Sequence, residues 1–77
     1  MYVLVTRNQC NFCDLAKEIL KGSGIMYVEY NVQSGSSRWI LDLLKKAGYT
    51  TVPQVWDSQG NHIGGYTELK EALVKEL

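Results

Sequence analysis

The only two cysteines of this chain, Cys10 and Cys13, lie between an apolar run and a helical pattern. Residues 1–6 are nearly continuous in apolar character, which predicts a buried strand. Residues 11–21 carry apolar side chains at the spacing of an amphipathic helix, and glycines follow that can end it. A strand that delivers a CxxC pair to a helix N-terminus is an arrangement that can activate a thiol.

The rest of the chain continues the alternation of strands and helices. Sequence patterns predict a strand, a helix, two strands joined as a hairpin and a last helix over residues 25–32, 37–47, 52–56, 61–64 and 67–76. A right-handed crossover makes the first two strands parallel, and the hairpin adds an antiparallel pair. We therefore predict an α/β fold of order β-α-β-α-β-β-α, with three helices around a four-stranded mixed sheet. The 77 residues are expected to form one domain.

The helical patterns also predict caps and core-facing side chains. The segment Ser34-Gly35-Ser36-Ser37 offers serine N-caps to the second helix, and Thr67 offers one to the third. The residues expected to face the core are Phe12, Leu15, Ala16, Ile19 and Leu20, then Ile40, Leu43, Leu44 and Ala47, and finally Leu69, Ala72 and Leu73. Phe12 has a second interpretation as a rim residue beside the thiol.

The charge balance and the cysteine content restrict the classes of protein that fit. Eight basic and eight acidic residues cancel, which gives no sign of nucleic-acid or membrane-surface binding. No apolar run is long enough to span a bilayer, and the first residues lack the features of an export signal. We therefore expect a reducing, cytoplasmic compartment. A CxxC bridge closes too small a loop to add much stability, which favours a redox role.

The position of the cysteines predicts their separate roles. If Cys10 is the helix N-cap, its sulfur faces the free N–H groups of Phe12 and Cys13. The partial positive charge of the helix N-terminus then favours the thiolate, the attacking species in disulfide exchange. Arg7 either adds a cation beside the thiol or is a solvated surface residue, and the charge of Asp14 opposes thiolate formation. We predict that Cys10 attacks and that Cys13 resolves.

Two further motifs follow the cysteine pair, and each has two interpretations. In Thr51-Val52-Pro53, the only proline either starts a strand with the commoner trans bond or forms a cis bond that aims the Val52 backbone at the thiol. The Gly-Gly-Tyr-Thr segment at residues 64–67 is either a simple turn or a helix N-terminus that holds a carboxylate. Arg38 either binds a second carboxylate or is plain surface charge.

Taken together, these motifs resemble those of glutaredoxins, a glutathione-dependent branch of the thioredoxin superfamily, and the resemblance covers essentially the whole chain. The motifs that carry it are Cys10-x-x-Cys13, Thr51-Val52-Pro53 and His62-Ile63-Gly64-Gly65-Tyr66-Thr67. The residues that the resemblance assigns to substrate binding are Arg7, Phe12, Arg38, Thr51, Val52, Pro53, Gly65, Tyr66, Thr67 and Glu68.

The resemblance also implies individual roles. It implies a cis bond before Pro53 and backbone pairing of Val52 with the cysteine of glutathione. It implies that Tyr66, Thr67 and Glu68 hold the γ-glutamyl end. Arg7 stands where glutaredoxins usually have a Lys or Arg, and Arg38 falls close to a position that serves the glycyl carboxylate. Phe12 replaces the usual Tyr and keeps its ring.

The function implied is that of a monomeric, glutathione-dependent thiol-disulfide oxidoreductase that reduces protein disulfides and glutathione mixed disulfides. No metal is expected, because His62 with two cysteines leaves a structural zinc site one ligand short. Two alternatives remain open. Residues 6–10 also resemble a small redoxin that serves ribonucleotide reductase and is recycled by thioredoxin reductase. Asn11, in place of the usual Pro, leaves room for an iron–sulfur cluster held between two monomers.

Overall fold

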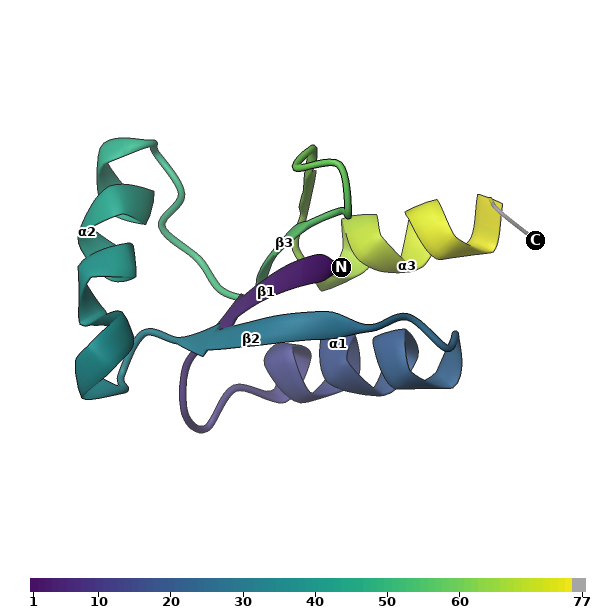
Figure 1. The fold of residues 1–77 in the computed structure, drawn as a ribbon, viewed down its shortest axis with the longest axis horizontal. Coiled ribbons are helices and arrows are strands. Elements are labelled where there is room, and N and C mark those ends of the chain that lie inside the picture. The colour runs from purple at the N-terminus through teal and green to yellow at the C-terminus, as the bar shows by residue number, and fades with distance from the viewer. Residues whose placement is uncertain (76–77) are drawn as a thin grey trace.

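The computed structural model describes residues 1–75 and has the predicted order of elements (Figure 1). The strands are β1 (Tyr2–Thr6), β2 (Tyr27–Asn31), β3 (Gln54–Trp56) and β4 (His62–Gly64). The helices are α1 (Asn11–Gly22), α2 (Arg38–Lys46) and α3 (Tyr66–Lys75), with a 3₁₀ turn, Gly35–Ser37, before α2. The predicted end of the last helix near residue 76 lies outside the described residues.

The four strands form one mixed sheet in the order β2-β1-β3-β4. β1 pairs in parallel with β2 and antiparallel with β3, and β4 completes the antiparallel hairpin. This confirms the predicted parallel pair and the predicted hairpin. β1 is therefore a central strand, and its last three residues are buried. The chain leaves the sheet after Thr6 and returns as α1, so the cysteine pair lies at the C-terminal end of a central strand.

Helices cover both faces of the sheet, and each face has its own hydrophobic cluster. The cluster under α1 and α3 consists of Leu4, Ala16, Leu20, Val55, Leu69 and Leu73. The cluster under α2 consists of Val5, Val32, Ile40 and Leu44. Because neighbouring strand residues point to opposite faces, Leu4 and Val5 anchor different clusters. Figure 1 shows α1 running alongside β2, while α2 stands apart from α1 and α3.

The core-facing side of α1 is rotated from the predicted one. Phe12 is 59% exposed and Leu15 is also exposed, so the expectation that they face the core is wrong. Cys13 takes the inward position instead, together with Ala16 and Leu20. The physical reason is the packing of α1, because the side that carries Ala16 and Leu20 meets the sheet and α3. Phe12 is therefore a rim residue, which was the second of the two interpretations of its position in the sequence.

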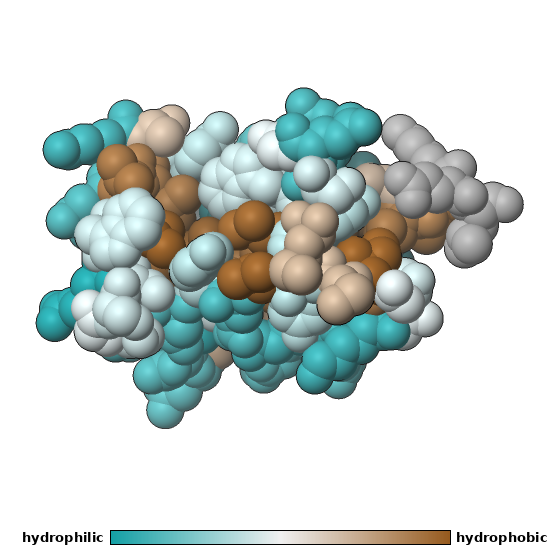
Figure 2. Space-filling view, in the orientation of Figure 1, coloured by the Kyte–Doolittle hydropathy of each residue, from teal (hydrophilic) through white to brown (hydrophobic). Residues whose placement is uncertain are grey.

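The predicted face of α2 is also only partly buried. Ile40 and Leu44 are buried, whereas Leu43 is 53% exposed and Ala47 is exposed. A single helix lies on this face, so the sheet covers only a narrow stripe of α2. An apolar groove of about 410 Å³ stays open between α2 and the sheet, with Trp39 and Trp56 in its lining. Figure 2 shows hydrophobic residues reaching the surface in a band from α2 toward α3.

The helix starts differ from the predicted caps. Neither Ser34 nor Ser37 makes a side-chain cap, because the 3₁₀ turn before α2 uses backbone bonds, with the Ser37 N–H donating to the Ser34 carbonyl at 3.0 Å. Thr67 is the second residue of α3 rather than its cap. The Glu68 carboxylate instead reaches back to accept from the Gly65 N–H at 2.7 Å, as in half of a capping box.

Among residues 1–75, no helix is long and apolar enough to cross a membrane.

Candidate active site

Cys10 is the N-cap of α1, as predicted. Its backbone is extended, and its Sγ accepts a hydrogen bond of 3.2 Å from the Cys13 N–H. The two sulfur atoms are bonded as a disulfide, with the Cα atoms 5.2 Å apart. Cys10 is 8% exposed and Cys13 is 1% exposed, so Cys10 is the more accessible of the two residues. The cap position places Cys10 Sγ at the positive end of the α1 dipole.

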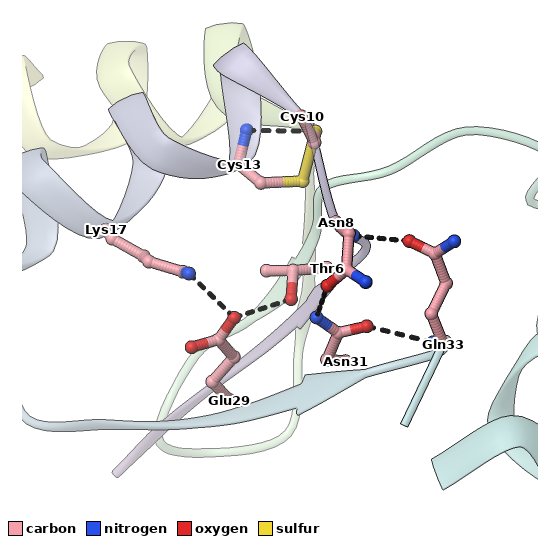
Figure 3. A network of polar contacts seen from close by, with 8 residues as sticks. All are labelled: Thr6, Asn8, Cys10, Cys13, Lys17, Glu29, Asn31 and Gln33. Carbon is pink, nitrogen blue, oxygen red and sulfur yellow. Dashed lines mark hydrogen bonds and ion pairs between the residues drawn. A yellow bond between two sulfur atoms is a disulfide. The ribbon is translucent and has the colours of Figure 1, made fainter. Parts of the chain in front are cut away.

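The loop between β1 and Cys10 is held by amide side chains from the end of β2 (Figure 3). Asn31 donates from Nδ2 to Oδ1 of Asn8 at 2.8 Å, and its own Oδ1 accepts from the Gln33 N–H at 2.9 Å. The Gln33 Oε1 in turn accepts from the Asn8 N–H at 2.5 Å. Gln9 takes a left-handed φ of 52° within this loop. These bonds fix the backbone that presents Cys10.

An ion pair lies beside the cysteine helix, one turn after Cys13. Lys17 Nζ is 2.8 Å from Glu29 Oε2, which also accepts from the buried Thr6 hydroxyl at 2.6 Å (Figure 3). Burial raises the pKa of the Glu29 carboxyl, but hydrogen bonds from Lys17 and Thr6 lower it more, so the net pKa lies below its usual value. Hydrogen bonding to Glu29 likewise raises the pKa of Lys17. The pair joins α1 to β2.

We expect Glu29→Gln to lower the free energy of unfolding by about 1 kcal/mol at neutral pH, since the charged pair is lost. The folded-state pKa of Glu29 is depressed, so its contribution is present above the unfolded value of 4.5 and is lost as the pH falls through the folded value. The difference between wild type and variant should therefore shrink in acid. Urea unfolding from pH 7 to pH 3 measures this, with the exposed Glu18→Gln on the same helix as control. A difference that stays constant with pH would contradict the assignment.

The Val52–Pro53 peptide bond is cis, as the family resemblance implied. Pro53 is buried, and β3 begins at the next residue. The carbonyl oxygen of Val52 lies 4.0 Å from Cys10 Sγ. The segment before β3 therefore lies directly beside the sulfur of the cap cysteine, although the two are far apart in the chain.

Eight of the ten predicted substrate-binding residues line one groove of about 300 Å³, which we call the cis-proline groove. They are Phe12, Thr51, Val52, Pro53, Gly65, Tyr66, Thr67 and Glu68. The ring centroids of Phe12 and Tyr66 are 6.1 Å apart. Gly64 makes the turn behind the groove possible, because its φ is 125° and a Cβ there would lie 2.7 Å from Glu68 Oε1.

The two predicted arginines lie in different places. Arg7 lines a second groove of about 380 Å³, which shares Thr51 and Val52 with the cis-proline groove. Arg38 is exposed at the first position of α2 and lines neither groove. Lys45, two turns along the same helical face, is the α2 cation that lines the groove of Arg7. Lys45 was not predicted from the sequence, and its i, i+7 spacing from Arg38 is the signal that could have identified it.

His62 is a hydrogen-bonded residue of β4. Its Nε2 lies 2.7 Å from Oε1 of Gln54, and its ring packs against Tyr49 and Trp56. Across residues 1–75, no cluster of three or more His, Cys, Asp or Glu side chains has the arrangement of a metal site.

A strand that delivers a cysteine pair to a helix N-terminus, beside a cis-proline, defines a thioredoxin-like redox protein. The glutaredoxin family profile matches residues 2–63. A glutaredoxin of Pseudomonas aeruginosa is 36% identical over 67 residues, which cover 87% of this chain and 77% of that protein. This chain therefore belongs to the glutaredoxin family. Its cysteine pair makes it a dithiol thiol-disulfide oxidoreductase.

Solved structures agree with this assignment. Glutaredoxin 1 from Francisella tularensis, complexed with cacodylate, matches with a TM-score of 0.78 and 31% identity, covering 96% of this chain and 92% of that one. A buckwheat glutaredoxin–glutathione complex matches with a TM-score of 0.82 and 27% identity, covering 97% of this chain and 69% of that one.

Proposed function

We propose that this glutaredoxin binds glutathione in the cis-proline groove and reduces glutathione mixed disulfides and protein disulfides. The observation that carries the proposal is the position of Val52. This residue forms part of the groove wall, and its carbonyl oxygen lies 4.0 Å from Cys10 Sγ. A tripeptide lying along that wall would present its sulfur to Cys10. The buckwheat relative, solved as a glutathione complex, supports the choice of ligand.

The groups around the groove complement the two ends of glutathione. The first N–H groups of α3, at Tyr66 and Thr67, have no acceptor within the helix and suit the γ-glutamyl carboxylate. The carboxylate of Glu68, on the same wall, suits the γ-glutamyl ammonium group. Arg7 and Lys45, in the adjoining groove, suit the glycyl carboxylate. Arg38 lines neither groove, so its location does not support the binding of the glycyl carboxylate that the family resemblance implied for it.

The proposed reaction is a series of thiol-disulfide exchanges that begins at Cys10. The Cys10 thiolate attacks one sulfur of the substrate disulfide, forms a mixed disulfide and releases the other sulfur as a thiolate that takes a proton from water. With a protein substrate, the Cys13 thiolate then attacks Cys10 Sγ, which releases the reduced protein and leaves the Cys10–Cys13 bridge. Two glutathione molecules reduce that bridge and leave as glutathione disulfide.

The test compares two electron donors with the same protein substrate. NADPH oxidation is followed with glutathione plus glutathione reductase, and separately with thioredoxin reductase alone. We expect rapid turnover in the first assay and little in the second, because the proposed groove selects glutathione. Turnover with thioredoxin reductase alone would contradict the proposal and would instead support the small redoxin that serves ribonucleotide reductase.

A further inference from the structure

Gln54 is a buried polar residue that lies behind the cis-proline groove without lining it. The residue is only 6% exposed. Its Nε2 donates to the Thr51 carbonyl at 2.9 Å and lies 3.4 Å from the Thr51 hydroxyl oxygen. Its Oε1 lies 2.7 Å from Nε2 of His62. Gln54 therefore bridges β4 to the segment that carries Thr51 and Val52.

The direction of these hydrogen bonds follows from their chemistry. The Thr51 carbonyl can only accept, so the amide nitrogen of Gln54 must face it. The amide oxygen then faces His62, and His62 must carry a proton on Nε2 to donate to it. Replacing Gln54 with a residue that lacks an amide removes both hydrogen bonds of the bridge. Replacing His62 with a residue that lacks a donor removes only the bond to Gln54 Oε1.

The imidazole end of the bridge is held by aromatic packing. The His62 ring centroid lies 4.4 Å from that of Tyr49 and 5.0 Å from that of Trp56. A side chain packed in this way gives Gln54 a fixed partner on its far side. The position of Thr51 is thus set through side chains from β3 and β4, both of which lie behind the groove wall.

We propose that Gln54, anchored by His62, is a positioning residue that holds the Thr51–Val52 backbone in the orientation glutathione needs. The inference rests on the proposed glutathione function and adds to it the residues that shape the site from behind. Neither side chain lines the cis-proline groove, so both act through Thr51. Loss of the bridge should weaken substrate binding while leaving the Cys10 cap at α1 in place.

The test measures KM and kcat for a glutathionylated peptide, with saturating glutathione and glutathione reductase. Gln54→Met keeps the size of the side chain and removes both hydrogen bonds. We expect its KM to rise about fivefold with kcat nearly unchanged, which indicates lost binding rather than lost chemistry. His62→Phe keeps a ring against Tyr49 and removes only the donor, so its KM should rise about twofold. Gln59→Met, an exposed change in the turn of the same hairpin, should leave KM unchanged.

The outcomes separate this inference from the proposed function. If wild type shows no saturation with the glutathionylated peptide, the glutathione site itself is wrong. If wild type saturates and folded Gln54→Met has the same KM, Gln54 only stabilises the fold and the positioning role is overturned. Should Gln54→Met fail to fold, His62→Phe decides, because it keeps an aromatic ring against Tyr49 and Trp56 and leaves the buried Gln54 in place. An unchanged KM in that variant would overturn the proposal.

Discussion

Cys10→Ser is expected to remove both the reduction of protein disulfides and the reduction of glutathione mixed disulfides. The loss should be about 10³-fold or more, because every proposed exchange begins at Cys10 and a serine hydroxyl does not ionise at neutral pH. Coupled NADPH assays with a disulfide-bonded protein and with a glutathionylated peptide measure the two activities. Residual turnover above a tenth of wild type with either substrate would contradict the assignment of Cys10.

The N-cap position of Cys10 provides a stability control for this variant. Serine is a preferred N-cap residue, so its Oγ can replace Cys10 Sγ as the acceptor of the Cys13 N–H. We therefore expect Cys10→Ser to unfold in urea at nearly the same midpoint as reduced wild type. A matched midpoint shows that the lost activity comes from the sulfur and not from a damaged helix.

Cys13→Ser is expected to separate the two activities. Reduction of the glutathionylated peptide should stay within about threefold of wild type, because glutathione can release the Cys10 mixed disulfide directly. Reduction of a protein disulfide should fall about 100-fold, because that release requires the second thiol. The same pair of assays measures both effects.

The burial of Cys13 supports this division. Cys13 is 1% exposed, so a substrate outside the protein cannot reach it before it reaches Cys10. The mixed disulfide of the variant should accumulate with a protein substrate and be visible by mass spectrometry. Equal loss of both activities in Cys13→Ser would show that Cys13 is needed for more than resolution.

Most of the fold was predictable because it depends on local patterns. The apolar run of β1, the Gly-rich end of α1 and the turn before β4 are each signalled within a few neighbouring residues. The helix faces were harder to predict. Leu15 and Leu43 belong to apolar stripes in the sequence, yet both are exposed. A stripe shows that a helix has an apolar side, but the number of elements packed against it decides how much of that side is buried.

The residues of the candidate site also include some that the local sequence predicts and some that it does not. Cys10 as the N-cap of α1 follows from its place directly before a helical pattern. The cis bond before Pro53 was implied by the family motif and not by spacing alone. Arg38 falls close to a position where the family resemblance implies carboxylate binding, but it lines neither groove. Lys45 lines the groove of Arg7, although it belongs to none of the family motifs.

The sequence by itself determined the order of elements, the cysteine pair at a helix N-terminus and the membership of a redox family. Helical period, capping and turn chemistry act over a few residues, so the sequence records them directly. The tertiary structure decided that Val52 lies beside Cys10, which the sequence left as one of two interpretations, and it alone placed Gln54 between Thr51 and His62. Val52 and Cys10 are 42 residues apart, and Gln54 meets His62 through the pairing of β3 with β4, so neither contact follows from a pattern of neighbouring residues.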